Sequence, residues 1–241
     1  MTDLPRPTIT FCGHATLLFT FADGRKVILD PWLAGNPACP EALKSFDRLD
    51  GMLITHGHDD HMADAAALGR AHKPQHVLAT IELCSVLERQ GVGNTRPMNL
   101  GGTQDVFGMQ VTMVRADHTA GAPDGSGGFM QGGVATGFVI RMPDGFTLYF
   151  AGDTDVFLDM QLIGELYKPD VAFLPIGDIF TMGPRAAAYA CRLLGAPKVV
   201  PIHYGTFPVL TGTPEQFRRE VEALDLTIEI VDLQPGDRYP G

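Results

Sequence analysis

Four side chains able to bind a metal ion lie within six residues, in the pattern His56-x-His58-x-Asp60-His61. His56 and His58 are alternate residues of an extended segment, so both rings point to the same side and can grip one ion. Asp60 and His61 fall at the start of the helix expected next, and Gly57 permits the sharp turn before them. Zinc prefers such nitrogen and oxygen ligands, and a catalytic zinc keeps one position for water. The pattern therefore predicts a metal site rather than a polar loop.

Three more candidate ligands lie farther along the chain, each just past the end of an apolar run. His118 follows Met109–Arg115, Asp153 follows Phe146–Phe150, and His203 follows Lys198–Ile202. Binding sites in sheet proteins covered by helices gather at one end of the strands, so these three should meet the first four. Seven ligands exceed what one tetrahedral ion takes. Two divalent ions are therefore expected, with zinc favoured and manganese, iron or nickel as alternatives.

The hydrophobic pattern predicts short strands interrupted by single crossover helices. Strands are expected over Thr8–Cys12, Ala15–Phe21, Arg25–Leu29, Gly51–Thr55, Val77–Thr80, Met109–Arg115, Val134–Arg141, Phe146–Phe150, Val171–Leu174, Lys198–Ile202 and Thr227–Val231. Helices are expected from the metal-binding run to about His72 and over Ile81–Gln90, Phe157–Tyr167, Pro184–Leu194 and Pro214–Leu224. This order predicts mixed β-sheets covered by helices. No break in composition divides residues 1–241, so one domain is expected.

Charge and composition limit the classes of molecule that the protein is expected to bind. The chain has 18 Lys plus Arg against 28 Asp plus Glu, a net charge of −10, which disfavours nucleic acid and leaves a small molecule as the expected substrate. The polar N-terminus and broken apolar stretches predict neither a secretory signal nor a membrane span. Four widely separated cysteines fit buried thiols in the cytoplasm. The composition is compatible with a homo-oligomer.

Other polar residues near the candidate ligands in the sequence are also candidates for a role in the site. Asp30 could accept an imidazole N–H and fix a ligand's orientation, or could simply form the turn before a proline. His14 is expected to line the pocket as a catalytic group that binds substrate or transfers a proton, its simpler role being a hydrogen-bonded turn histidine. Asp178 and Thr181 are expected to contact a ligand or the substrate, with a plain cap as the alternative. Trp32 is expected to serve packing.

The Gly-rich segment Thr119–Gly133 begins directly after the candidate ligand His118. We expect it to border the mouth of the site and to move over the substrate. An inert surface excursion is the alternative.

The ligand pattern resembles the metallo-β-lactamase superfamily over nearly the whole chain. Four motifs resemble one branch of it, the UPF0173 metal-dependent hydrolases, which are related to ascorbate-6-phosphate lactonase. These motifs are Gly13-His14-Ala15, Asp30-Pro31-x-x-x-Gly35-Asn36-Pro37, Pro175-Ile176-Gly177-Asp178-x-Phe180-Thr181-Met182-Gly183-Pro184 and Pro201-Ile202-His203-Tyr204-x-Thr206-Phe207-Pro208. The resemblance implies an α+β fold, an αββα sandwich of two mixed β-sheets flanked by helices. It also implies one metal on His56, His58 and His118, a second on Asp60, His61 and His203, and Asp153 as the bridge.

These observations predict a hydrolase in which two metal ions activate water for attack on an ester, lactone or phosphoester of a small molecule. Asp60 or His61 could hold the water and pass its proton on, and the sequence does not choose between them. A nuclease or phosphodiesterase acting on nucleic acid is one alternative. A metal-binding interaction protein without catalysis is the other.

Overall fold

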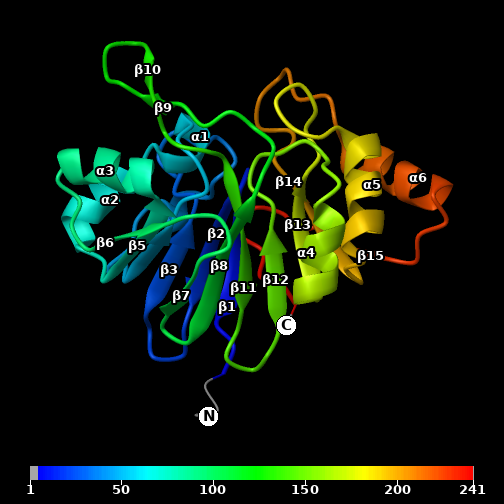
Figure 1. The fold of residues 1–241 in the computed structure, drawn as a ribbon, viewed down its shortest axis with the longest axis horizontal. Coiled ribbons are helices and arrows are strands. Elements are labelled where there is room, and N and C mark those ends of the chain that lie inside the picture. The colour runs from blue at the N-terminus through cyan, green and yellow to red at the C-terminus, as the bar shows by residue number, and fades with distance from the viewer. Residues whose placement is uncertain (1–4, 241) are drawn as a thin grey trace.

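Two β-sheets lie face to face between two layers of helices in the computed structural model, which describes residues 5–240 (Figure 1). The first sheet has six strands in chain order: β1 (Thr8–Gly13), β2 (Thr16–Thr20), β3 (Lys26–Leu29), β4 (Gly51–Leu53), β5 (His76–Thr80) and β6 (Thr95–Met98). The second runs β15 (Glu229–Ile230), β14 (Lys198–Ile202), β13 (Val171–Pro175), β12 (Thr147–Phe150), β11 (Thr136–Arg141), β8 (Met109–Arg115) and β7 (Thr103–Val106). A small hairpin joins β9 (Ala122–Pro123) to β10 (Phe129–Met130).

Each sheet is mixed in the same way. Its first strands in chain order pair antiparallel, and its last four strands pair parallel. In consequence β1, β3, β4 and β5 run in one direction in the first sheet, and β8, β12, β13 and β14 run in one direction in the second. The carboxyl ends of such strands meet at one edge of a sheet, where their loops gather.

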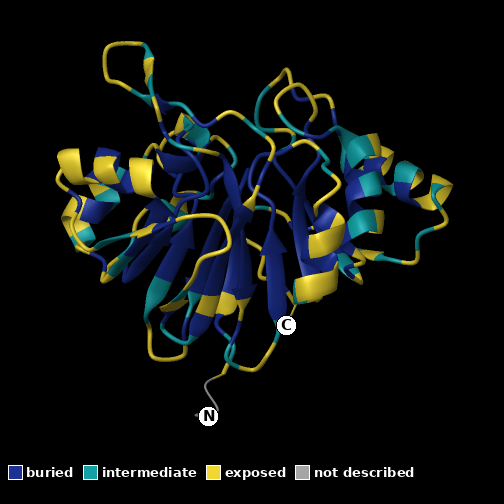
Figure 2. Ribbon diagram, viewed as in Figure 1, coloured by how far each residue is buried: buried dark blue, intermediate teal, exposed yellow. Residues whose placement is uncertain are grey.

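The core between the sheets follows from the two-residue period of a strand. Leu17 and Phe19 of β2 point into the apolar cluster shared by both sheets, whereas Leu18 between them points to the helices outside the first sheet. Figure 2 shows the strands buried and the outer helix faces exposed. This arrangement confirms the predicted αββα sandwich.

The helices cover the two outer faces. They are α1 (Asp59–Met62), α2 (Ala65–His72) and α3 (Ile81–Arg89) on the first sheet and α4 (Met160–Tyr167), α5 (Pro184–Leu194) and α6 (Pro214–Ala223) on the second, with a 3-10 turn at Glu41–Leu43. The bounds of α5 match the prediction because Pro184 suits the first helical position and Gly195 ends the helix in the left-handed region. None of the helices in residues 5–240 has the length and hydropathy that crossing a bilayer requires.

The structure corrects several predicted elements. β6 and β7 were not expected: both are edge strands with polar residues, and Pro97 in β6 is tolerated only at an edge. The helix expected after the metal-binding run is broken into α1 and α2 near Asp64, whose carboxylate accepts from the backbone N–H of Leu33 at 2.6 Å. The helix expected from Phe157 begins only at Met160.

Candidate metal centre

All seven predicted ligands follow strands whose carboxyl ends share one edge of the sandwich. The members that follow β4 are His56 and His58, with Asp60 and His61 in α1, while His118 follows β8, Asp153 follows β12 and His203 follows β14. This edge lies at the top of Figure 1, where α1 is labelled. The parallel pairing of the strands, rather than proximity in sequence, brings the seven side chains together.

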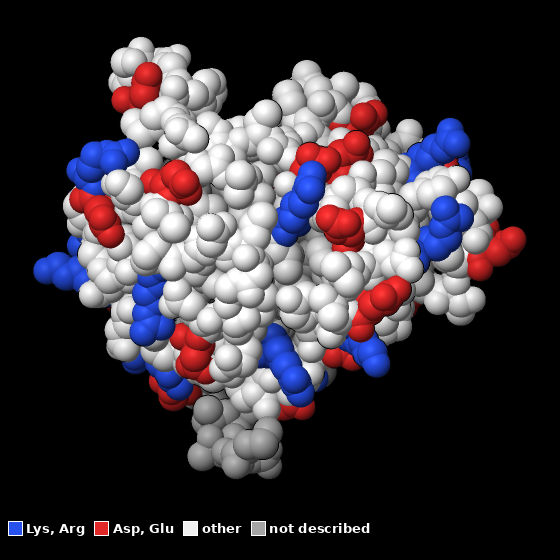
Figure 3. Space-filling view, viewed as in Figure 1, with Lys and Arg blue, Asp and Glu red and all other residues white. Residues whose placement is uncertain are grey.

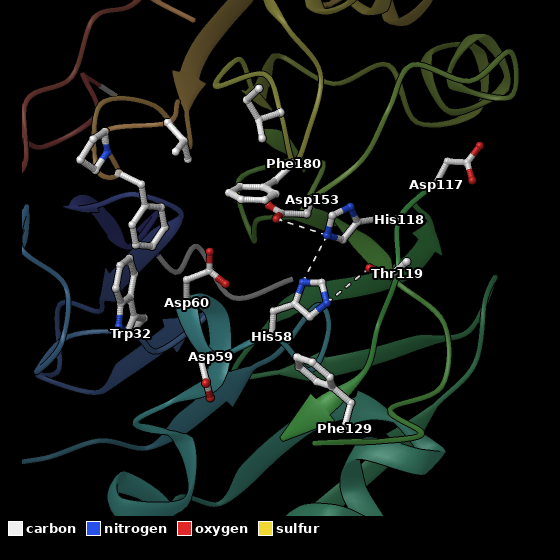
Figure 4. Close-up of a pocket in the computed structure, with 14 residues that line it drawn as sticks. Trp32, His58, Asp59, Asp60, Asp117, His118, Thr119, Phe129, Asp153 and Phe180 are labelled. Atoms are coloured by element: carbon white, nitrogen blue, oxygen red, sulfur yellow. Dashed lines mark hydrogen bonds and ion pairs between the residues drawn. The ribbon is translucent and has the colours of Figure 1, made fainter. Parts of the chain in front are cut away.

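One group of ligand atoms consists of His56, His58, His118 and Asp153, all within 4.8 Å of one another. The His58 Nδ1 atom lies 3.0 Å from His56 Nε2 and 3.3 Å from His118 Nε2. Asp153 Oδ2 lies 3.6 Å from His118 Nε2. Figure 4 shows His58, His118 and Asp153 converging from separate elements. Three imidazoles and a carboxylate at this spacing suit a tetrahedral ion.

The second group consists of His14, Asp60, His61 and His203, again within 4.8 Å of one another. Asp153 reaches this group too, with 3.1 Å from its Oδ1 to His61 Nε2 and 3.1 Å from its Oδ2 to His203 Nε2. The Asp153 carboxylate therefore lies between the two groups.

Four buried atoms of these residues make no hydrogen bond: His203 Nδ1, and the three that meet around Asp153, which are His61 Nε2, His203 Nε2 and Asp153 Oδ1. A buried polar atom without a partner costs about 1–3 kcal/mol, so such atoms are rare unless something else satisfies them. A divalent cation would accept all three lone pairs at once. The donor set and its orphaned atoms therefore fit a metal ion.

Burial and the negative charge of Asp153 have opposite effects on the pKa values of His61 and His203. Burial disfavours a charged ring, yet the neighbouring carboxylates outweigh it. Asp153 together with Asp60 raises the pKa of His203 to about 9, and Asp153 together with Asp30 raises that of His61 well above its usual value. The same two rings overcome the effect of burial on Asp153 and hold its pKa well below the ordinary range. A proton and a metal ion compete for the same nitrogen lone pair, so metal binding at this group releases protons.

Asp30 is fully buried and binds the ligand His61. Its carboxylate accepts from His61 Nδ1 at 2.7 Å and from the Thr55 N–H and hydroxyl at 2.8 and 2.7 Å. With the Nδ1 proton directed at Asp30, the lone pair of neutral His61 lies on Nε2, which faces Asp153. Of the two roles open from the sequence, the contacts favour orientation of a ligand.

Three residues of the site have a strained backbone. His14, Asp30 and His203 all adopt left-handed conformations, with φ of 58°, 48° and 55°. Such conformations cost on the order of 1–3 kcal/mol each in non-Gly residues and persist where the surrounding structure holds them. Gly152, before Asp153, has φ 64°, and a Cβ there would lie 2.5 Å from the Thr136 carbonyl oxygen. Only glycine therefore fits at the turn that aims Asp153.

His14 does not line the pocket, contrary to expectation. Its side chain is fully buried, its Nε2 lies 3.2 Å from Asp60 Oδ2, and its Nδ1 lies 3.0 Å from the Thr206 hydroxyl. Its ring also lies against His203, with centroids 3.9 Å apart. Burial and the neighbouring His203 lower the pKa of His14 to about 4, so the ring is neutral at pH 7. The left-handed turn points the ring inward, where it contacts Asp60 rather than substrate.

Asp178 and Thr181 also lie outside the pocket lining. The exposed Asp178 carboxylate accepts from the Ile179 N–H at 2.8 Å and from the Thr211 hydroxyl at 3.3 Å, and Thr181 donates to the carbonyl of the next residue. Both residues shape a turn. The residues between them, Ile179 and Phe180, line the pocket instead.

The pocket above the ligands has a volume of about 1230 Å³ and walls that the sequence did not identify. Trp32 is buried, as expected for packing, but it also forms one wall, stacked on Phe207 with centroids 5.6 Å apart. The other apolar lining residues are Phe129, Ile179, Phe180, Pro208 and Val209. Phe129, Pro208 and Val209 lie on segments that follow the candidate ligands His118 and His203, and this is the only sequence signal that could have found them. Ile179 and Phe180 lie on the loop after β13, which carries no candidate ligand.

Comparison with known proteins agrees with this geometry. Residues 25–204 match the family model described as "Beta-lactamase superfamily domain". A UPF0173 metal-dependent hydrolase of Solibacter usitatus is 48% identical over 228 residues, covering 95% of this chain and 97% of the relative. One from Archaeoglobus fulgidus is 43% identical over 231 residues, covering 96% and 97%.

A solved structure is similar over the same length. Igni18, a metallo hydrolase of the archaeon Ignicoccus hospitalis, superposes with a TM-score of 0.82 at 32% identity, covering 98% of each chain. A putative metal-dependent hydrolase of Parabacteroides distasonis shares the fold at 22% identity, with a TM-score of 0.70 over 96% of this chain and 99% of the other. The chain belongs to the metallo-β-lactamase superfamily and, within it, to the UPF0173 metal-dependent hydrolases.

Proposed function

We propose that residues 1–241 form one hydrolase domain that uses two divalent metal ions to cleave an ester, lactone or phosphoester of a small molecule. Zinc is the proposed metal because it prefers nitrogen and oxygen ligands of this kind. The observation that carries this proposal is the position of Asp153 between two groups of His and Asp ligand atoms. Together the two groups offer seven predicted His and Asp ligands, more than one tetrahedral ion takes.

The proposed ligands divide as the two groups do, except that His14 of the second group is assigned to hold Asp60 and not to bind metal. One ion would be held by His56, His58 and His118 and the other by Asp60, His61 and His203, with Asp153 shared. When bound, such ions lower the pKa of a water molecule and polarise the oxygen that gains charge as the water attacks.

Asp60 is the proposed catalytic carboxylate. Its side chain is 22% exposed and lines the pocket, whereas that of Asp153 is 3% exposed and His61 is fully buried. Burial opposes its charge, but His14 and His203 outweigh this and lower the pKa of Asp60, so it is ionised at pH 7. It can therefore accept a hydrogen bond from the attacking water and orient it, while His14 holds the carboxylate from its buried side.

The alternative of a nucleic-acid substrate has less support. The chain carries a net charge of −10, and Figure 3 shows basic and acidic side chains interspersed on one face rather than a continuous basic surface. A phosphate backbone is normally bound by clustered Lys and Arg.

A substrate panel tests the proposed function. Carboxyl esters, lactones, phosphodiesters and thioesters are incubated with protein that has been stripped of metal and then reloaded with zinc or manganese. We expect turnover of at least one ester, lactone or phosphoester that disappears on stripping and returns on reloading. Metal-loaded protein that turned over none of them and bound a macromolecule tightly would favour the interaction protein instead.

We also propose that the segment Thr119–Gly133 covers bound substrate. It contains the β9–β10 hairpin, which projects from the sandwich in Figure 1, and Phe129 on that hairpin lines the pocket. Deleting the hairpin tip, residues 124–128, should lower kcat/KM roughly tenfold, the equivalent of about 1.4 kcal/mol of apolar contact. Metal content should stay unchanged because His118 precedes the deletion. Unaltered kinetics would show that the segment is an inert excursion.

A further inference from the structure

The pocket walls are unusually apolar for a surface open to water. Phe129 is 73% exposed, Ile179 60%, Phe180 52% and Val209 51%, and all four line this one pocket. Figure 4 shows Asp60 and His58 between the rings of Trp32 and Phe129 in this view. Exposed apolar side chains that cluster around polar groups mark a binding surface for an apolar partner or ligand.

One of these side chains is held out by a strained backbone. Ile179 has φ 62° and follows Asp178 at φ 66°. A β-branched residue in the left-handed region is a genuine outlier, and strain of this kind gathers at functional sites. The turn is held by hydrogen bonds from the Phe180 N–H to the Asp178 carbonyl at 2.6 Å and from the Met182 N–H to the Thr154 carbonyl at 3.0 Å. Glycine would fit this turn better, so the isoleucine side chain serves another purpose.

The charged groups of the lining have a single sign apart from the histidines. The described lining residues include the carboxylates of Asp59, Asp60, Asp117 and Asp153 and no Lys or Arg. The Arg115 guanidinium lies 4.0 Å from Asp117, but it stands over the Phe157 ring outside the lining. An anionic substituent that projects away from the two proposed ions would therefore meet Asp59 or Asp117 without a side-chain cation to offset the repulsion.

We propose that the pocket takes an uncharged ester or lactone carrying an alkyl or aryl group, and that it discriminates against phosphorylated and carboxylated analogues. This rests on the proposed hydrolase function. In the reaction the water oxygen joins the acyl carbon, the acyl C–O bond breaks, and the released alkoxide oxygen takes a proton from the water. The apolar group of the substrate lies against the Phe129, Ile179, Phe180 and Val209 side chains.

Esters that share the same acetyl C–O bond test the charge preference, with release of acetate as the measured rate. Phenyl acetates that carry a 4-methyl, 4-carboxylate or 4-phosphate group are compared on zinc-loaded protein, with each rate divided by its rate of hydrolysis by hydroxide. We expect kcat/KM to be highest for the methyl compound and at least about tenfold lower for the phosphate. Asp117→Asn should narrow the gap between the methyl and carboxylate compounds. A phosphate compound that is the best substrate would overturn the proposal.

Lactones of increasing side-chain length test the apolar walls. From γ-butyrolactone to γ-nonalactone, kcat/KM should rise roughly two- to fourfold for each methylene that is buried. Ile179→Gly relieves the strained turn and should fold, and Phe129→Ala removes the opposite wall; each should lower the ratio of kcat/KM for the long and short lactones about fivefold. The matched control is Leu162→Ala, because Leu162 is 52% exposed on α4 outside the pocket and its loss should leave both rates unchanged. A flat series would overturn the proposal while leaving hydrolase activity intact.

Binding can be measured apart from turnover because the chain has one tryptophan, Trp32, in the pocket wall. We expect 2-nonanone, an uncharged ketone, to change the Trp32 fluorescence at a lower concentration than octyl phosphate does. Ile179→Gly should weaken the binding of the ketone. If no ester or lactone is turned over but this difference holds, the proposed reaction fails and the pocket preference stands. If octyl phosphate binds more tightly than the ketone, the preference is wrong whatever the reaction.

Discussion

Asp153→Ala is expected to lower kcat at least about 100-fold and to reduce the metal content below two equivalents. The loss should exceed the 10- to 100-fold that removal of an outer hydrogen-bond partner of a metal ligand costs. Asp153 lies 3.1 Å from both His61 and His203 and 3.6 Å from His118, so its removal takes a ligand atom from each group. Two dications held close together would also lose the carboxylate that offsets their repulsion. Elemental analysis and steady-state kinetics measure both effects.

The control for this variant is Asp159→Ala, because Asp159 is exposed just before α4 and makes no capping hydrogen bond. Circular dichroism should show both variants folded, since the core between the sheets does not include Asp153. A saturated, active enzyme that holds one equivalent of metal and is indifferent to Asp153→Ala would show that the assignment of two ions is wrong.

Asp30→Asn is expected to lower metal affinity and turnover by roughly 10- to 100-fold. Asparagine tolerates the left-handed backbone at this position, where φ is 48°, so the turn should form. Its side chain has one acceptor oxygen in place of two, whereas Asp30 accepts from His61 and from both donors of Thr55. An amide NH₂ directed at His61 Nδ1 would favour the wrong tautomer and take the lone pair away from Nε2. Zinc titration against a competing chelator measures the change.

A loss of stability alone would not produce this result. Thr16→Val is the matched control: the Thr16 hydroxyl is buried and donates to the Asp30 backbone carbonyl at 2.6 Å, without touching the carboxylate. It should lower the free energy of unfolding by about 1 kcal/mol while zinc affinity stays unchanged. Equal zinc affinity in Asp30→Asn and the native protein would leave Asp30 a purely structural role.

The metal ligands could be found from the sequence because their chemistry restricts residue type and their position restricts context. His118, Asp153 and His203 each follow an apolar run, and a polar metal-binding residue at the end of a buried strand is visible without any tertiary information. The same reasoning located most strands and placed α5 correctly, since Pro184 and Gly195 mark its ends. It failed for β6 and β7, because edge strands bury too little to need an apolar pattern.

Only the tertiary structure identified the residues that form the walls of the pocket. Trp32 and Phe207 come from two loops and Phe129 from the β9–β10 hairpin, and an isolated apolar residue there has the same sequence signature whether it packs in the core or faces a pocket. The roles of His14 and Asp178 depended on backbone angles of 58° and 66°, which direct one side chain inward to Asp60 and the other into its own turn. Residue type and spacing thus determined what could bind a metal. The pairing of distant strands and the local φ values decided which side chains face it, because side-chain direction is set by the backbone that neighbouring segments hold in place.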